Sequence, residues 1–261
     1  MKTKMKTKMQ SIVKMNLRVI ILLITATTIA QSKDVYLLIG QSNMAGRPEI
    51  EGATEKIKNV AILHSSGKFV YAKNPLNKYS TIRKDLKGQR LSPAYSFSKK
   101  MVEHTKDSIR IIVQARGGTP IAKFMKGNNW GYYEATLNRV KNALERYPDL
   151  NLKAVLVHQG ESDRKKSKAY LKSVKHMIEA FRKDLKMKEL PFIFGEIGAW
   201  NPDYKKIRKE MKKIPEIIPY TYLVSSDELT NLDKHHFDRK SILELGERYA
   251  EKCIEVLYKS K

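Results

Sequence analysis

Short apolar runs alternate with longer amphipathic stretches along this chain. The runs are typical of buried strands and lie at residues 35–39, 60–63, 109–113, 154–157, 191–195 and 221–224. Apolar residues recur at helical spacing at about residues 92–104, 132–147 and 167–186, and again after Asp238. Strands that alternate with helices predict an α/β fold, a three-layer α/β/α sandwich with a central, mainly parallel sheet. In the first of these helices, Ser92 is expected to be the cap and Pro93 the first residue.

Three of the apolar runs end in polar clusters. Residues 40–46 read Gly-Gln-Ser-Asn-Met-Ala-Gly, residues 114–119 read Gln-Ala-Arg-Gly-Gly-Thr, and residues 158–163 read His-Gln-Gly-Glu-Ser-Asp. Each cluster has a structural explanation, such as capping by Asp163 or a turn at Gly117 and Gly118. In open parallel α/β sheets, however, ligands bind at the carboxyl ends of the strands. The three clusters together therefore indicate a site at that edge.

Ser42 stands where a nucleophile would sit in the first cluster. Gly40 allows a sharp exit from the strand, and a helix opened by the following residues would aim free N–H groups at a developing oxyanion. The Gly-x-Ser-x-Gly elbow is excluded, because Met44 occupies the position of its second glycine. The alternative is that Ser42 merely caps the helix.

A candidate base lies near the C-terminus, where residues 233–238 read Asp-Lys-His-His-Phe-Asp. An aspartate three residues before a histidine can fold back on it within one turn, so Asp233 can orient His236 to accept a serine proton. The alternative is that Asp238 caps the last helix and the histidines are ordinary surface residues.

These four blocks, in this order, resemble the SGNH-hydrolase superfamily, and specifically the branch of carbohydrate esterase family six and the sialate O-acetylesterases. The resemblance extends from about Asp34 to the C-terminus. It implies that Ser42 is the nucleophile and that His236, which falls in the Asp-x-x-His-Phe pattern, is the general base. Asp233 is favoured as the residue that orients the base. Glu161 is the alternative, or a second carboxylate that supports the site.

The resemblance also implies an oxyanion hole. Its donors would be the backbone N–H of Ser42, that of Gly117 or Gly118, and the side-chain amide of Gln159, where the wider superfamily has an asparagine. Trp130 and Arg47 are candidate substrate contacts, and aromatic packing is the alternative role for Trp130.

The implied activity is two-step acyl transfer that removes acetyl groups from an acetylated carbohydrate, with no cofactor and no metal. Xylan-type polysaccharide is the favoured substrate, which makes the chain acetylxylan esterase-like. A sialate O-acetylesterase is the alternative, as is a non-catalytic glycan-binding protein on the same fold. Lipid or aryl esters are a further option, disfavoured because no long apolar lid segment occurs. The oligomeric state stays open.

Composition fits one esterase domain over residues 31–261, because a chain of 261 residues with 41% hydrophobic content can bury one sizeable core. Residues 1–30 are expected to be a signal peptide for export, periplasmic or secreted, since basic residues precede an apolar stretch that ends near Ala30. An uncleaved membrane anchor is the alternative. The single cysteine, Cys253, lies among apolar helix positions, so its side chain is expected to pack against other apolar residues.

The formal net charge is +24, from 51 Lys and Arg against 27 Asp and Glu. Residues 1–30 hold five lysines and one arginine, so the remaining chain carries 45 minus 27, or +18. These charges are spread over the predicted helices, which favours a solvated surface and argues against a nucleic-acid partner. Attraction to acidic polysaccharide remains open.

Overall fold

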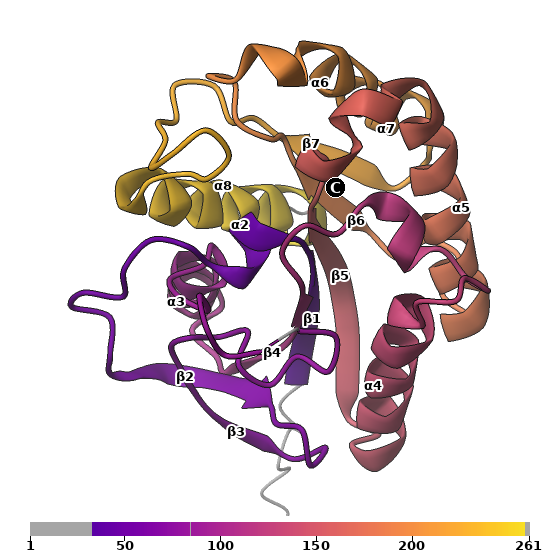
Figure 1. Cartoon of the computed structure of the whole chain (residues 1–261). Helices are drawn as coiled ribbons and strands as arrows, with labels where there is room; N and C mark the ends of the chain where they lie inside the picture. Colours follow the sequence, from indigo (N-terminus) through magenta and orange to yellow (C-terminus); the bar gives the residue numbers. More distant parts are fainter. Residues whose placement is uncertain (1–32, 84, 259–261) are drawn as a thin grey trace, which may run out of the picture. The chain divides into compact units, whose positions relative to one another are not determined.

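A seven-stranded sheet forms the centre of the computed structural model, which describes residues 33–83 and 85–258 (Figure 1). The strands are β1 (Lys33–Gly40), β2 (Lys56–Leu63), β3 (Phe69–Lys73), β4 (Ile109–Ala115), β5 (Leu150–His158), β6 (Phe192–Gly195) and β7 (Thr221–Val224). Their order in the sheet is β3-β2-β4-β1-β5-β6-β7, and every neighbouring pair is parallel except β2 with β3.

Helices cover both faces of this sheet. They are α2 (Ser42–Ala45), α3 (Ala94–Thr105), α4 (Tyr132–Arg146), α5 (Ser167–Leu185), α6 (Lys205–Lys212), α7 (Ile214–Ile217) and α8 (Arg239–Leu257). Three short 3₁₀ helices accompany them: η1 (Ile121–Phe124), η2 (Glu161–Lys166) and η3 (Pro202–Tyr204). The predicted fold class, a three-layer α/β/α sandwich with a mainly parallel sheet, is confirmed.

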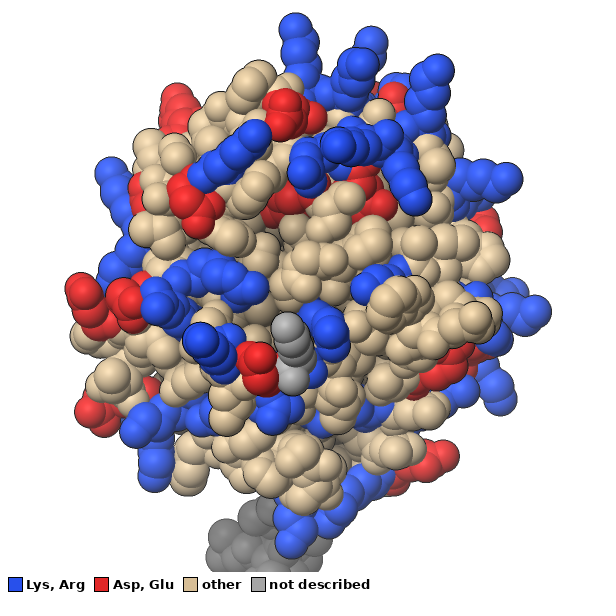
Figure 2. Space-filling model, in the orientation of Figure 1, with Lys and Arg blue, Asp and Glu red and all other residues tan. Residues whose placement is uncertain are grey.

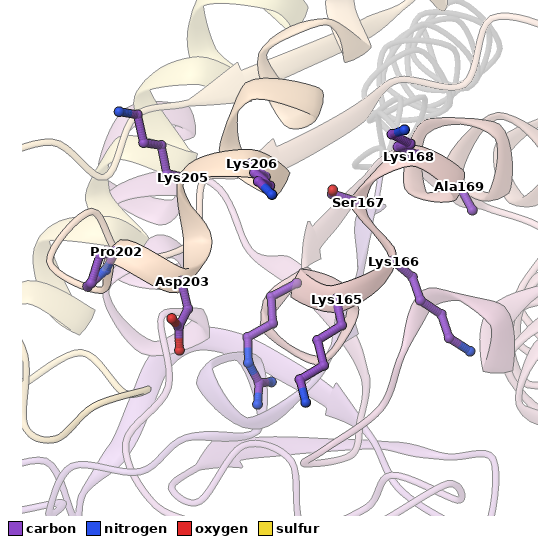
Figure 3. Close-up of a pocket in the computed structure, with 10 residues that line it drawn as sticks. Lys165, Lys166, Ser167, Lys168, Ala169, Pro202, Asp203, Lys205 and Lys206 are labelled. Atoms are coloured by element: carbon purple, nitrogen blue, oxygen red, sulfur yellow. The ribbon is translucent and has the colours of Figure 1, made fainter.

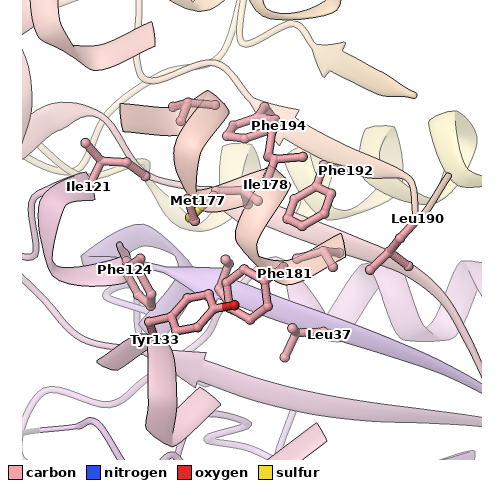
Figure 4. Packing of buried hydrophobic residues seen from close by; sticks show 14 of the residues in the cluster. Leu37, Ile121, Phe124, Tyr133, Met177, Ile178, Phe181, Leu190, Phe192 and Phe194 are labelled. Carbon is pink, nitrogen blue, oxygen red and sulfur yellow. The ribbon is translucent and has the colours of Figure 1, made fainter. Parts of the chain in front are cut away.

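Strand β1 shows why both faces need cover. Its side chains alternate between two apolar clusters: Leu37 and Ile39 join one, and Tyr36 and Leu38 join the other. The first cluster packs under α4 and α5, and Figure 4 shows its aromatic centre, including Phe181 from α5. The second packs under α3 and α8, which lie together on the opposite face in Figure 1. A strand that is apolar on both sides therefore sits at the middle of the molecule.

The exit of β1 is fixed by Gly40. Its φ is +153°, and a Cβ there would lie 2.2 Å from the carbonyl oxygen of His158. The next residue, Gln41, donates its backbone N–H to that same oxygen at 3.0 Å. Gly40 is in register with Ala115 of β4 and with His158 of β5. The three polar clusters therefore meet at one edge of the sheet, as the sequence predicts.

Two predictions about helix starts have opposite outcomes. Asp238 does cap α8, because its Oδ1 accepts the backbone N–H of Ser241 at 2.8 Å. The prediction that Ser92 caps α3 is wrong: the helix begins after Pro93, and the Ser92 hydroxyl is buried with no hydrogen-bond partner among the described residues. The carbonyl of Ser92 instead accepts the N–H of Tyr95.

Cys253 is fully buried on the inner face of α8, which confirms its predicted role in packing. Burial raises the pKa of its thiol, so the thiolate is disfavoured. None of the described helices has both the length and the apolar character needed to cross a bilayer. The predicted signal peptide, residues 1–30, lies outside the described residues.

Candidate active site

A pocket of about 370 Å³ opens at the edge of the sheet where β1, β4 and β5 end. The residues that line it are Gln41, Ser42, Arg47, Gly117, Gly118, Glu161, Ser162, Arg164, His235 and His236. The structure thus gathers most of the sequence-predicted site residues around one pocket. Gln159 and Trp130 do not line it, and Asp233 reaches it through His236.

Ser42 is the first residue of α2 and is 6% exposed. Its position at a helix start leaves its backbone N–H without an acceptor inside the helix. Across from it, a Cβ on Gly117 would lie 3.7 Å from the Ser42 Cβ and 2.4 Å from a guanidinium nitrogen of Arg47. Position 117 therefore admits only glycine unless Arg47 moves. Glycine at this position allows the backbone of the turn after β4 to approach Ser42 closely.

The backbone N–H groups of Gly117 and Gly118 donate to no protein acceptor within the described part of the chain. They belong to a tight turn after β4, and both glycines line the pocket that contains Ser42. Unpaired N–H groups beside a serine hydroxyl are the donors that an oxyanion hole requires. The turn and the start of α2 supply them from two different elements.

His236 is paired with Asp233. Its Nδ1 lies 2.7 Å from Asp233 Oδ2, while Asp233 Oδ1 accepts the backbone N–H groups of His235 at 2.7 Å and His236 at 2.9 Å. Both carboxylate oxygens are thus engaged by the residues that follow in sequence. The contact fixes Nδ1 as the nitrogen that faces the carboxylate, which leaves Nε2 as the free nitrogen of the ring.

Two opposing effects act on the pKa of Asp233. Burial would raise this pKa, but the hydrogen bonds from the His236 ring and from the two backbone N–H groups outweigh it and hold the pKa below its usual range. The carboxylate therefore stays ionised to lower pH than a free aspartate. Its hold on His236 persists through mildly acidic solution, so protonation of Asp233 is not expected to limit activity there.

Two residues that precede η3 help to hold the loop that carries Asp233 and His236. Trp200 Nε1 and Asn201 Nδ2 both donate to the carbonyl of Lys234, at 3.2 Å and 3.1 Å. The Trp200 ring also meets Phe237 edge to face, with 4.8 Å between the ring centroids. Trp200 therefore packs behind the loop and helps to hold His236 in place.

Asn43 joins three parts of the site, and sequence reasoning did not single it out. Its side-chain nitrogen donates to Glu161 Oε1 at 2.6 Å and to the carbonyl of His235 at 3.1 Å. Its side-chain oxygen accepts the backbone N–H of Phe237 at 3.2 Å. Fully buried beside Ser42, Asn43 ties α2 to the loop that carries His235 and to η2. The sequence signal is only its place directly after the serine.

Glu161 is a buried carboxylate with no hydrogen bond or ion pair to His236. It is 3% exposed, and its nearest partners are Asn43 and the Nε2 of His158, 3.6 Å away. Burial would raise the pKa of Glu161, whereas His158 and Asn43 lower it, and the net pKa lies below the usual range. Of the two predicted alternatives, Asp233 is the carboxylate in contact with His236, and Glu161 contacts Asn43 instead.

The geometry does not support the predicted oxyanion role of Gln159. Its side chain is fully buried, and its amide nitrogen donates to the carbonyl of Thr119 at 3.0 Å and to Asp163 Oδ2 at 2.5 Å. Both amide hydrogens are therefore used inside the protein. Asp163 also accepts the N–H of Ile121, so Gln159 and Asp163 fasten the loop after β4 to the end of β5.

The two predicted substrate contacts differ in position. Arg47 lines the pocket, and its Nη1 is held by the carbonyls of Gly46 at 2.7 Å and Gly88 at 3.0 Å. Burial lowers the pKa of Arg47, although the charge of Asp233 works against this. Trp130 lies outside the pocket. It is 58% exposed, and the ammonium of Lys123 stands 3.4 Å from its ring centroid.

Replacing Asn43 with alanine should test its bracing role. We expect the free energy of unfolding to fall by about 3 kcal/mol, because the change removes three hydrogen bonds, those to the Glu161 carboxylate, to the His235 carbonyl and from the Phe237 N–H. We also expect kcat to fall by at least about tenfold through the loosened histidine loop. Denaturant unfolding and ester hydrolysis measure the two effects. Asn142→Ala, at an exposed position of α4, is the control, and equal behaviour of the two variants would contradict the role.

The fold and the pocket define a hydrolase class: a serine, a histidine and an aspartate gathered at the carboxyl edge of a parallel α/β sheet. The family described as carbohydrate esterase, sialic acid-specific acetylesterase matches residues 32–255. The chain belongs to this family and is a carboxylic ester hydrolase.

Solved structures share the fold. A protein from Arabidopsis thaliana superposes with a TM-score of 0.76 at 22% identity, over 86% of this chain and 99% of that one. NanS gives a TM-score of 0.67 at 16% identity, over 89% and 100% of the two chains. A carbohydrate acetylesterase from Xanthomonas citri gives 0.62 at 18% identity, over 87% and 57%. The comparison with curated proteins finds no match.

Proposed function

We propose that this protein is an exported O-acetylesterase that removes acetyl groups from sugars by a Ser42, His236 and Asp233 acyl-enzyme mechanism. The observation that carries the proposal is the 2.7 Å contact between His236 and Asp233 at the pocket that also contains Ser42. Membership of a carbohydrate esterase family supports the substrate class. Export rests on the basic and apolar pattern of residues 1–30 alone.

In the proposed first step, His236 Nε2 takes the hydroxyl proton of Ser42 while Oγ forms a bond to the ester carbonyl carbon. The resulting oxyanion accepts hydrogen bonds from the N–H of Ser42 and from Gly117 or Gly118. Collapse breaks the bond to the sugar oxygen, which leaves as the alcohol with the proton from His236. Water, deprotonated by the same histidine, then cleaves the acetyl-serine and releases acetate.

The pocket also favours one kind of sugar over another. Arg47 and Arg164 both line it, and neither guanidinium forms an ion pair with a carboxylate in the described part of the chain. Two guanidinium groups beside the nucleophile suit a substrate that carries a carboxylate. This favours an O-acetylated sialic acid, in line with the family's description, over a neutral acetylated xylan. Xylan decorated with uronic acid remains compatible with the same charges.

Acetate release from three substrates tests the proposal. O-acetylated sialic acid, acetylated xylan and a small aryl acetate would be offered to the purified protein, with Ser42→Ala as the blank. We expect turnover of the aryl acetate and a higher kcat/KM for the sialic acid than for xylan. Turnover of xylan alone would restore the xylan-type substrate. Release from none of the three would contradict the esterase mechanism and favour glycan binding without catalysis.

A further inference from the structure

A second and larger depression adjoins the catalytic pocket. It measures about 850 Å³ and is lined by Arg164, Lys165, Lys166, Ser167, Lys168, Ala169, Pro202, Asp203, Lys205 and Lys206. We call it the basic groove. One wall comes from η2 and the start of α5, and the other from η3 and the start of α6. Figure 3 shows the lysines of both walls around the open space between these segments.

The six cations of the basic groove form no salt bridge with a carboxylate in the described part of the protein, although the charge of Lys166 acts on the buried Asp163. Six of its residues are cationic, and its one acid, Asp203, is paired outside the groove with Lys234 at 3.2 Å. None of the five lysines forms an ion pair with a described carboxylate, and all five are exposed. Elsewhere lysines do find partners, as Lys126 does with Asp184. Figure 2 shows basic side chains crowding the part of this face where Figure 1 places α6.

Arg164 connects the basic groove to the catalytic pocket, because it lines both. Its Nη1 donates to the carbonyl of Glu161 at 3.0 Å, which holds the guanidinium between the two hollows. A polymer with one sugar at Ser42 would therefore continue along the lysines. Positive charge that is concentrated beside a reaction site also raises the local concentration of an anionic substrate.

We propose that the basic groove binds the anionic chain of a carboxylate-bearing polysaccharide while one acetylated sugar of that chain occupies the catalytic pocket. The proposal rests on the esterase function above, and it extends the substrate from a single acidic sugar to a polymer. Continuity with a pocket for sugar esters favours a polysaccharide over a nucleic acid, which would offer the same charge without an acetyl ester.

A charge-reversed variant, Lys165→Glu with Lys168→Glu and Lys206→Glu, tests the groove without touching Arg164 or the catalytic pocket. The matched control reverses three exposed lysines outside the groove, Lys58 on β2, Lys99 on α3 and Lys141 on α4. Both variants should hydrolyse a small aryl acetate at the wild-type rate, which shows that each one folds.

Kinetics with partly acetylated polygalacturonate are the first measurement. We expect KM of the groove variant to rise at least about tenfold with kcat nearly unchanged, and the difference to shrink in high salt. The control variant should keep the wild-type KM within about twofold. An equal rise in both variants would mean that overall charge matters and would overturn the groove.

Binding of unacetylated polygalacturonate, dextran sulfate and RNA separates the sources of negative charge without any turnover. Polygalacturonate that binds the wild type and the control but not the groove variant supports the proposal, even if the protein releases no acetate. In that case it is the esterase mechanism that fails. Tighter binding of dextran sulfate or RNA, lost in the groove variant, would reassign the groove to sulfated glycans or to nucleic acid. Esterase activity without polygalacturonate binding would overturn the proposal for the basic groove but not the proposed esterase function.

Discussion

Replacing Ser42 with alanine is expected to lower kcat for acetyl esters by roughly 10⁵-fold to 10⁶-fold, with little change in stability. In the proposed mechanism the hydroxyl supplies the nucleophile, and the variant keeps every backbone N–H of the pocket. Residual turnover over the uncatalysed rate, of roughly 10³-fold, should come from the oxyanion donors and from substrate binding. Acetate release and denaturant unfolding measure the two quantities.

Ser162→Ala is the matched control for this change. Ser162 lines the same pocket, but it belongs to η2 and not to the helix that follows β1. Its backbone N–H donates to Gln41 Oε1 at 3.4 Å, a hydrogen bond that alanine keeps. We expect wild-type kcat within about threefold. A fluorophosphonate reagent should label the wild type and Ser162→Ala but not Ser42→Ala. Loss of activity at Ser162 with retention at Ser42 would move the nucleophile to η2.

The sequence predicts the central strands because each is apolar on both faces and can be recognised without its neighbours. Strand β3 is missed for the opposite reason: it is an edge strand whose pattern is half exposed, with Tyr71 70% exposed. Helix α6 is also missed, because only Ile207 and Met211 of its eight residues are buried. Two apolar positions among lysines are too few to show a helical periodicity. Apolar periodicity reports burial, so weakly buried elements leave little signal in it.

Contacts within the site can be predicted from the sequence only when the two partners are close together along the chain. The pairing of Asp233 with His236 is readable from a spacing of three residues, since one turn brings them together. The bonds of Asn43 reach residues 118, 192 and 194 positions away, and nothing in one sequence marks them. The position of a residue within a motif does not determine the direction of its side chain. The motif places Gln159 at the end of a strand, but Thr119 and Asp163 determine where its amide points.

Asp233→Asn should lower kcat by roughly 10⁴-fold while KM changes little. Asparagine can still accept the two backbone N–H groups through its oxygen, so the loop is expected to fold. Its amide nitrogen would then face His236 Nδ1 and donate to it, which stabilises the tautomer with the proton on Nε2. That nitrogen could no longer take the proton of Ser42. The variant also lacks the charge that would stabilise the imidazolium during the reaction, and steady-state kinetics of acetate release measure the loss.

Glu161→Gln separates the two carboxylates that the sequence left as alternatives. Glutamine can still accept the Asn43 amide, and Glu161 has no hydrogen bond or ion pair to His236, so kcat is expected to stay within about tenfold of the wild type. Stability should fall instead, because the charge that faces His158 is lost. In acidic solution, the Asp233 carboxylate of the wild type should stay ionised, and keep its contact with His236, at pH values below the ordinary pKa of an aspartate, because the pKa of Asp233 is lowered. A collapse of kcat in Glu161→Gln with near-normal Asp233→Asn would make Glu161 the residue that orients the base.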